Sequence, residues 1–100
     1  MTALEDVAAE RRRQVEVEGR TQEGDDAYLS GQLARAAACY ALNAGQAGAQ
    51  LMPRTSHGIP LAWPWADAWW KPSNARRDLV KAAALIVAEI DRIDRSQADD

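Results

Sequence analysis

Apolar residues recur at steps of three and four in the first part of the chain, which predicts an amphipathic helix. Thr2 and Glu5 have the spacing of a capping box, so this helix should begin there. Gly19 favours its end. The predicted apolar stripe consists of Leu4, Val7, Ala8, Arg11 and Val15.

Arg11 falls on this stripe, and two interpretations of its position are open. Its methylene stem can cover the core while the guanidinium reaches water, or the side chain can reach into a pocket. Beside it, Glu10, Gln14 and Glu18 form a row at four-residue steps. That row is either a solvated face or the polar lining of the same pocket.

Residues 19–30 show no period, so we expect a loop there with a possible short turn at 25–29. A second helix is predicted over residues 31–48, with Ser30 as its N-cap. Its small residues would let another helix approach closely. Its stripe consists of Leu33, Ala37, Tyr40, Ala41 and Ala44.

Residues 49–73 contain every proline of the chain, which excludes a continuous helix over this segment. Residues 61–65 are too interrupted by proline to form a strand that pairs well. A connection of 25 residues is long for a compact domain, and such loops are usually functional or disordered. Because the segment also holds every Trp, we expect it to be ordered.

A third helix is predicted after Pro72, capped by Ser73 or Asn74 and ending near Arg95. Its two apolar seams together cover more than half of the circumference, so the helix should be buried on two sides, by its own chain and by a second copy. One seam contains Leu79, Ala83, Ile86, Ile90 and Ile93, and the other contains Val80, Ala84 and Val87.

The expected fold is therefore all-α: a single three-helix domain over residues 1–95, with a long ordered Trp- and Pro-rich loop between helices two and three, followed by a flexible tail at 96–100. About a fifth of the chain is Ala and there is no Phe. Because Ala buries little area at roughly 25 cal/mol per Å², a monomer would be only marginally stable, and we expect a homo-oligomer.

Charge and cysteine content narrow the possible partners. A net charge of −3 argues against a protein that binds long nucleic acids. The single Cys39 excludes an internal disulfide and a multi-cysteine zinc site, and we interpret it as a small buried residue. No segment approaches the roughly 20 apolar residues of a membrane span. We expect a cytoplasmic protein without membrane contact.

The strongest candidate binding site lies where the Trp-rich loop meets the third helix. A helix start attracts anions, and cationic residues there are unfavourable unless an anion or an acidic side chain answers them. Trp adds a flat surface on which a base can stack, worth about 1–3 kcal/mol. The site predicted for a nucleotide consists of Trp69, Trp70, Lys71, Arg76 and Arg77, with Arg11 and Gln14 contributing from the first helix.

A purely structural alternative is open for this cluster. Asp78, Glu89 or the carboxylates of the first helix could pair with the two arginines while the Trp side chains cap the core. No catalytic residue is predicted, since the lone His57, in a loop beside Ser56, is not accompanied by the elements of a catalytic triad.

A magnesium site is the alternative chemistry. Asp25 and Asp26, with Glu18 and Glu23 nearby, could supply the carboxylate oxygens that Mg²⁺ takes together with phosphate oxygens. Their spacing is not that of a calcium loop. Acidic loop residues of this kind are more often solvated or cap the next helix, so we predict no cofactor and keep Mg²⁺ at Glu18, Asp25 and Asp26 as the alternative.

Three motifs resemble a small, poorly characterised family of bacteriophages and prophages. They are ERRRQVEVEGRTQEGDD at 10–26, GQLARAAACYAL at 31–42 and WPWADAWWKPSNARRDLVKAAALIVAEIDRIDR at 63–95. In that family similar segments sometimes accompany dATP/dGTP pyrophosphohydrolase domains. The family pattern has Trp in place of Arg20 and His in place of Gly24, so the loop before Asp25 departs from it.

The Trp-rich cluster and this resemblance together suggest three functional hypotheses, and we favour the first, a binding protein, over an enzyme. The first is a protein that sequesters a nucleotide-derived immune signal, such as a cyclic nucleotide or an ADP-ribose derivative, in the cytoplasm of an infected bacterial host. The second is a metal-dependent nucleoside triphosphate pyrophosphohydrolase of the MazG-like type, with Glu10, Glu18, Asp25 and Asp26 around Mg²⁺. The third is an inhibitor of a host protein, with the Trp cluster as its contact surface.

Overall fold

The structure is a computed structural model that describes residues 2–45 and 52–98. Over these ranges it contains the α-helices α1 (Ala3–Glu16), α2 (Gln22–Asp26), α3 (Gln32–Ala44) and α5 (Ala75–Ala98), with a 3₁₀ turn, η1 (Asp67–Trp69). The described residues form no strand beyond an isolated bridge between Arg54 and Pro60. The all-α prediction is confirmed, but a fourth helix, α2, joins the three that were predicted.

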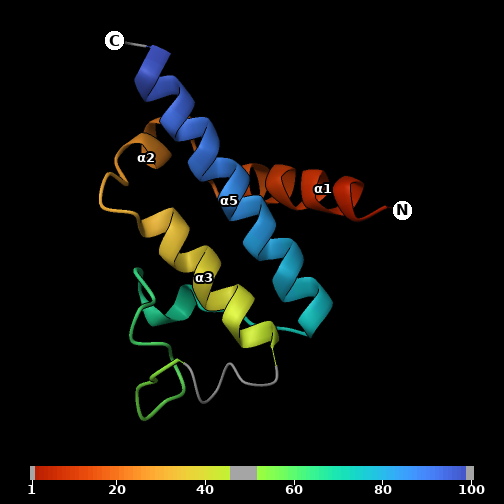
Figure 1. Cartoon of the computed structure of the whole chain (residues 1–100), viewed down its shortest axis with the longest axis vertical. Coiled ribbons are helices and arrows are strands. Elements are labelled where there is room, and N and C mark those ends of the chain that lie inside the picture. Colours follow the sequence, from red (N-terminus) through yellow and green to blue (C-terminus); the bar gives the residue numbers. More distant parts are fainter. Residues whose placement is uncertain (1, 46–51, 99–100) are drawn as a thin grey trace.

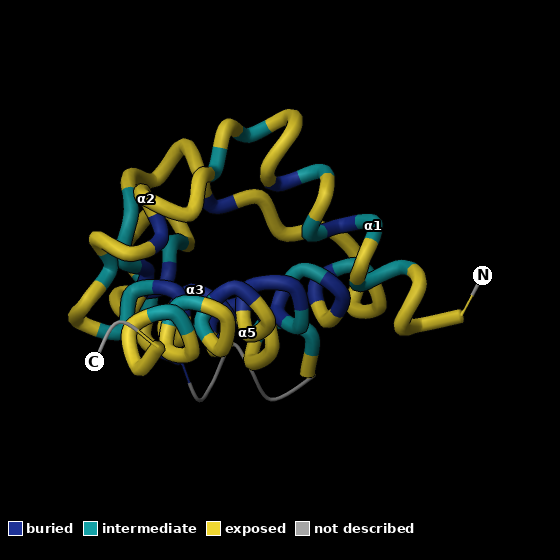
Figure 2. Tube along the Cα trace, turned by 90° about the horizontal axis from the view of Figure 1, so that it is seen from above, coloured by how far each residue is buried: buried dark blue, intermediate teal, exposed yellow. Residues whose placement is uncertain are grey.

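α3 and α5 lie side by side and antiparallel, and α1 crosses α5 on one side of this pair (Figures 1 and 2). The core between α3 and α5 is built mostly from small residues. Leu33, Ala36, Ala37, Cys39 and Tyr40 of α3 meet Ala82, Leu85 and Ala88 of α5. The predicted close approach of another helix to α3 is therefore confirmed, and Cys39 is buried as predicted.

α3 departs from its prediction at both ends. Gly31 occupies the N-cap position with φ of 80° and no side-chain cap, so the predicted Ser30 cap is wrong. A positive φ suits glycine because it lacks a Cβ. α3 ends at Ala44, and the predicted end at residue 48 lies outside the described residues. Ala41 of the predicted stripe is exposed.

α1 begins with the predicted capping box, in which Thr2 and Glu5 exchange hydrogen bonds between side chain and backbone. Its predicted buried stripe is wrong. Leu4 and Val15 are 82% and 45% exposed, whereas Glu10 and Gln14 are buried. Glu10 can be buried because it is paired with Arg13 and with Arg77 of α5, and Gln14 can be buried because it donates to Glu10.

α2 replaces the turn that was predicted at residues 25–29. The Thr21 hydroxyl accepts a hydrogen bond of 2.9 Å from the Gly24 N–H and caps this short helix. Five residues are too few to show a helical period. α2 turns Asp25 inward, where its side chain is fully buried.

α5 follows Asn74, whose side chain accepts a hydrogen bond of 2.9 Å from the Arg77 N–H. The helix continues to Ala98, three residues past its predicted end, and residues 99–100 of the predicted tail lie outside the described residues. In the predicted seam that begins at Val80, both Val80 and Ala84 are buried. Ile86 and its neighbours on the other seam face solvent in this chain.

The connection from residue 52 to residue 74 folds under α3 (Figure 1). Met52, Trp63 and Trp70 join the apolar core from this loop. Arg54 donates to Asn43 of α3 at 2.9 Å, which ties the loop to the helix. Across the described residues, no helix has the length and apolar character that a bilayer crossing requires.

Candidate functional site

A continuous series of aromatic rings runs from the core to the surface. The ring of Tyr40 stacks on Trp70 at 4.8 Å and meets Trp63 edge-on at 5.6 Å. Trp63 in turn meets Trp65 at 5.3 Å, and Trp65 meets Tyr28 at 5.4 Å. Because Trp63 and Trp70 are buried, their rings belong to the core. Trp70, which was predicted to contact a ligand, therefore acts as a packing residue.

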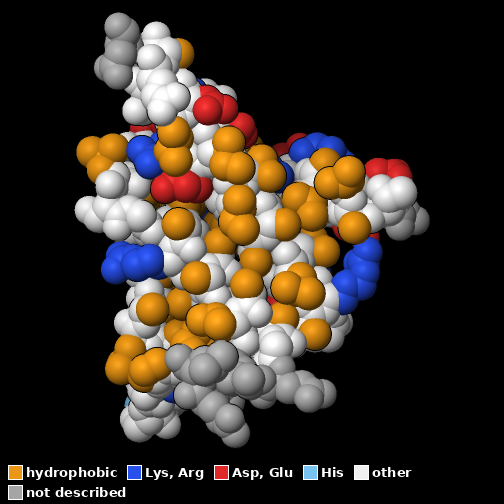
Figure 3. Space-filling view, in the orientation of Figure 1, with side chains coloured by type: hydrophobic (Ala, Val, Ile, Leu, Met, Phe, Trp, Pro, Cys, Tyr) orange, Lys and Arg blue, Asp and Glu red, His pale blue; other side chains and the backbone are white. Residues whose placement is uncertain are grey.

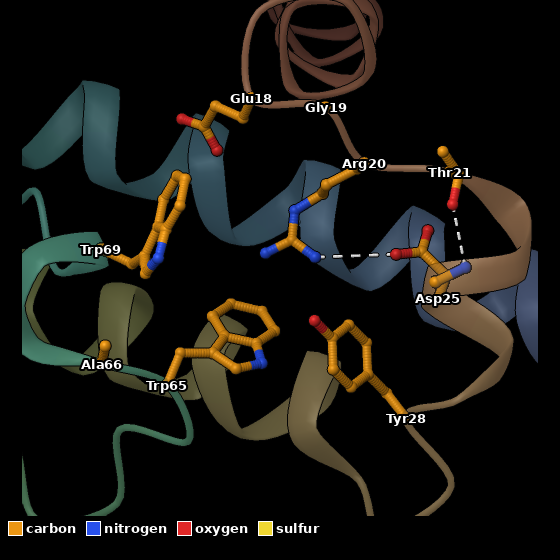
Figure 4. A pocket seen from close by; sticks show the side chains of 10 residues that line it. Glu18, Gly19, Arg20, Thr21, Asp25, Tyr28, Trp65, Ala66 and Trp69 are labelled. Atoms are coloured by element: carbon orange, nitrogen blue, oxygen red, sulfur yellow. Dashed lines mark hydrogen bonds and ion pairs between the residues drawn. The ribbon is translucent and has the colours of Figure 1, made fainter.

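The outer end of this series opens into a cavity of about 350 Å³ between the α1–α2 connection and the Trp-rich loop. Figure 4 shows Trp69 and Trp65 on one wall, with Arg20 reaching toward them from the opposite wall. The guanidinium of Arg20 lies 4.3 Å from the centre of the Trp65 ring, a cation–π contact. The lining residues are Glu18, Gly19, Arg20, Thr21, Gly24, Asp25, Tyr28, Trp65, Ala66 and Trp69.

Asp25 holds Arg20, the arginine that lines the cavity, in position. Its carboxylate accepts a hydrogen bond of 2.7 Å from Arg11 and lies 3.6 Å from Arg20. Arg11 also donates to Gln14 at 3.4 Å. Of these two predicted ligand contacts, Arg11 lies outside the lining of the cavity and holds Asp25 in place, whereas Gln14 lines the smaller chamber described below.

Trp65 carries an unused hydrogen-bond donor in the part of the chain that the structure describes. Its indole Nε1 is buried and finds no acceptor there, whereas the Nε1 of Trp63 donates to the Ala66 carbonyl at 3.1 Å. A buried donor without an acceptor costs about 1–3 kcal/mol. An acceptor on a bound molecule or a water would remove that cost.

A smaller polar chamber of about 30 Å³ adjoins the cavity and shares Glu18, Arg20, Trp65 and Trp69 with it. The chamber adds Arg13, Lys71 and Lys81 to the lining. Lys81 donates to the Lys71 carbonyl at 2.6 Å, and the ammonium of Lys71 lies 5.2 Å from the Trp69 ring centre.

Neither lysine has a carboxylate within 4 Å among the described residues. Burial lowers the pKa of Lys81, and the nearby positive charge of Arg77 lowers it further. Both effects disfavour the charged form of the amine. An anion in this chamber would oppose them.

Glu10 is the charged centre of the buried face of α1. It accepts hydrogen bonds of 2.8 and 2.9 Å from Arg13 and is also bonded to Arg77 of α5. Burial would raise the pKa of Glu10, but the hydrogen bond and charge of Arg13, together with the charge of Arg77, outweigh it and hold the pKa below 4.5. Glu10 therefore stays ionised and joins α1 to α5.

The two arginines at the start of α5 form ion pairs with carboxylates of the same chain. Arg76 pairs with Asp6 at 2.6 Å, and Arg77 pairs with Glu10. The premise that a phosphorylated guest must neutralise them is wrong, and the alternative, pairing with carboxylates of the first helix, is what the structure shows. Asp78 instead accepts hydrogen bonds from the Ser73 N–H at 2.7 Å and from Asn43 at 3.0 Å.

The alternative magnesium ligands do not converge. Glu18 pairs with Arg13 at 2.6 Å, Asp25 with Arg11 at 2.7 Å, and Asp26 with Arg95 of α5 at 2.8 Å. In the part of the chain that is described, no three His, Cys, Asp or Glu side chains gather in one place. Each of the three carboxylates is instead paired with an arginine.

Of the predicted ligand contacts, the structure places Trp69 on the larger cavity, and Gln14, Trp69 and Lys71 on the smaller chamber. The prediction missed Arg20, Tyr28 and Trp65. Trp65 could have been found, since it lies in the same aromatic segment as Trp69. No sequence pattern singled out Arg20 and Tyr28, because both lie in the segment 19–30, where apolar residues follow neither a helical nor a strand period.

Comparison of the chain with protein-family models, curated proteins and solved structures finds no match. The resemblance to a phage family thus stays an interpretation of the motifs.

Proposed function

We propose that the cavity and its adjoining chamber bind a small, nucleotide-derived molecule with a flat aromatic ring and an anionic group. The observation that supports this most is the half-exposed indole of Trp69 beside lysines that have no carboxylate partner in the described residues. The cavity, at about 350 Å³, is at the lower end of the roughly 300–1,000 Å³ common for small-molecule sites.

The aromatic ring of the ligand would stack on Trp69, which is 48% exposed and held at the mouth of the cavity by η1. Stacking needs only an open π face, and Trp69 offers one. The unused Nε1 of Trp65 supplies a hydrogen-bond donor for a ring or sugar acceptor. Arg20 adds a cationic plane across from Trp69 (Figure 4).

The anionic group would enter the chamber beside Lys71 and Lys81. The chamber lining has four cationic side chains, those of Arg13, Arg20, Lys71 and Lys81, against the two carboxylates of Glu10 and Glu18. This excess of positive charge favours an anion. A bound anion would also raise the pKa of Lys81, which burial and Arg77 lower in the free protein, and so would favour its charged form.

Binding without turnover is the better-supported activity. Glu18 and Asp25, the carboxylates of the cavity lining, are engaged by arginines, so neither is poised to act as a base or to hold Mg²⁺. The role that follows from the phage-family resemblance is sequestration of a nucleotide-derived immune signal in the cytoplasm of an infected bacterium. We propose a homo-oligomer as the binding unit.

Isothermal titration calorimetry of the folded protein against mononucleotides, cyclic dinucleotides, cyclic trinucleotides and ADP-ribose derivatives tests this function. At least one class should bind. Trp69→Ala should weaken that binding about 5- to 150-fold, since stacking on an aromatic ring contributes about 1–3 kcal/mol. Lys71→Ala should weaken it about 10- to 150-fold, since a hydrogen bond to a charged group contributes about 1.5–3 kcal/mol. The control is Arg12→Ala, which removes an exposed cation of α1 outside the cavity lining and should leave the affinity unchanged.

No heat with any ligand class would sink the proposal. Equal losses in Arg12→Ala and Lys71→Ala would show non-specific charge attraction and would also contradict it. Release of pyrophosphate from deoxynucleoside triphosphates by the purified protein would favour the pyrophosphohydrolase alternative instead.

A further inference from the structure

One face of α5 is apolar and uncovered in the single chain. Leu79, Ile86 and Ile90 are each about half exposed, at 52%, 47% and 51%, and Val87 and Ile93 are also exposed. Figure 3 shows apolar side chains gathered along the diagonal that α5 follows in Figure 1. Charged residues are the usual occupants of a solvent-facing helix surface, so this face has the composition of a contact surface.

The apolar positions on this face follow a coiled-coil rule. Leu79, Ala83, Ile86, Ile90 and Ile93 are separated by four, three, four and three residues, the repeat of a helix–helix seam. At 1.5 Å per residue, the seam extends over about 21 Å of α5. This pattern fits another helix with the same spacing better than it fits a flat or irregular surface.

The seam is complementary to itself when it is reversed. Leu79 and Ile93 both lie seven residues from Ile86. A two-fold axis near Ile86 would therefore place Leu79 of one chain against Ile93 of the other. The small Ala83 leaves room for the larger Ile90 of the opposite helix to approach.

The charges at the two ends of the seam select the direction. Arg76 lies at its amino-terminal end with a side chain 64% exposed, and its partner Asp6 lies on α1 of the same chain. Near the other end, Arg92 and Arg95 are paired with Glu89 and Asp26, which leaves the exposed Asp91 and Asp94 with no Lys or Arg nitrogen within 4 Å among the described residues. Parallel helices would bring the acidic ends of two copies together, whereas antiparallel helices place each acidic end near a basic one.

We infer that α5 packs through this seam against α5 of a second copy of the same chain, with the two helices antiparallel. The inference specifies the homo-oligomer of the proposed function as a two-fold dimer. It does not depend on the identity of the ligand, because no seam residue lines the cavity or the chamber. In the dimer α5 is covered on both sides, by α3 and α1 on one and by its copy on the other.

Sedimentation equilibrium over a range of protein concentrations tests the surface. The unmodified chain should dimerise, and Ile86→Glu should raise the dissociation constant of the dimer at least about 30-fold, as expected for a residue at the centre of an interface. The matched control is Leu61→Glu, which places the same charge at an exposed leucine of the loop and should leave the dimer intact. Circular dichroism establishes that both variants keep their helices.

A disulfide experiment tests the direction. In a Cys39→Ala background, a mixture of the Leu79→Cys and Ile93→Cys variants should form a mixed disulfide dimer under mild oxidation. Each variant alone should not. Self-linking of the Leu79→Cys variant would show a parallel pair and overturn the antiparallel arrangement.

A chain that stays monomeric at every concentration, or a dimer that is unaffected by Ile86→Glu, overturns the proposed surface. Ligand titration of the Ile86→Glu monomer separates this result from a failure of the proposed function. If the monomer still binds, the cavity stands without the dimer, and if a dimer forms that binds no ligand, the seam stands without the function.

Discussion

The two helices that pack on α5 are held there by different forces. α3 meets α5 mainly through apolar side chains, those of Leu33, Tyr40 and several alanines, with one polar link from Asn43 to Asp78. α1 meets α5 through Arg76 and Arg77, which pair with Asp6 and Glu10. The α3 side therefore supplies the stability of the fold, while the α1 side positions polar groups next to the cavity.

This difference explains where a binding site can form. An apolar contact between close-packed small residues leaves no room and no polar atoms for a ligand. The ionic contact on the other side keeps Arg13, Lys81 and Glu18 around a chamber that extends the aromatic cavity. Glu10, the buried carboxylate of the α1–α5 contact, is itself part of the chamber lining.

The largest expected effect comes from the adjacent pair Trp70 and Trp69. Trp70→Ala should lower the free energy of unfolding by about 3–5 kcal/mol, because its buried ring stacks on Tyr40 and would leave a cavity in the core. Trp69→Ala should cost less than about 1 kcal/mol, since its ring is half exposed. Urea unfolding of both variants measures the difference, and equal losses would contradict the division between core and site.

A smaller loss is expected on the ionic side. Glu10→Gln should lower the free energy of unfolding by about 1–3 kcal/mol, because Arg13 and Arg77 lose their shared carboxylate. Both guanidinium groups keep partial access to water, so the cost should stay below that of Trp70→Ala. Glu16→Gln changes an exposed carboxylate of the same helix and should be neutral in the same urea series.

The same network should make the ionic side sensitive to acid. The pKa of Glu10 is lowered below 4.5 in the folded chain, so its contribution is present above pH 4.5 and is lost as the pH falls through the folded pKa. The stability difference between the unmodified chain and Glu10→Gln should therefore shrink below pH 4.5. Urea midpoints of both proteins at several pH values measure it, and a constant difference would show that Glu10 does not act through its charge.

The smallest effect is expected for Arg76→Ala. Its ion pair with Asp6 is largely solvated, with the Arg76 side chain 64% exposed, and exposed pairs contribute about 0–1 kcal/mol. Any loss of unfolding free energy in Arg76→Ala should disappear in high salt, because salt screens the interaction between exposed charges most strongly. A loss as large as that of Glu10→Gln would mean that both ends of the α1–α5 contact are equally important.

Part of the site could be predicted from the sequence. The concentration of Trp in one loop indicated an aromatic cluster, and Trp69 and Lys71, both predicted as ligand contacts, lie on the lining of the chamber. The separation of Trp69 from Trp70 could not be predicted, because side chains that are adjacent in a loop point wherever the tertiary contacts of that loop turn them. Arg20 was missed because its role depends on Asp25, which α2 brings inward.

By itself, the sequence determined the local features of this protein: the all-α class, the capping box of Thr2 and Glu5, the Asn74 cap and the small residues that let α3 approach α5. These features depend on backbone hydrogen bonds and on neighbours a few residues away. Only the tertiary structure decided that α1 buries Glu10 and Gln14 and that carboxylates of α1 answer the arginines of α5. A polar side chain is buried when a partner from a distant segment compensates its lost hydration, and the spacing of residues along one helix does not record where that partner lies.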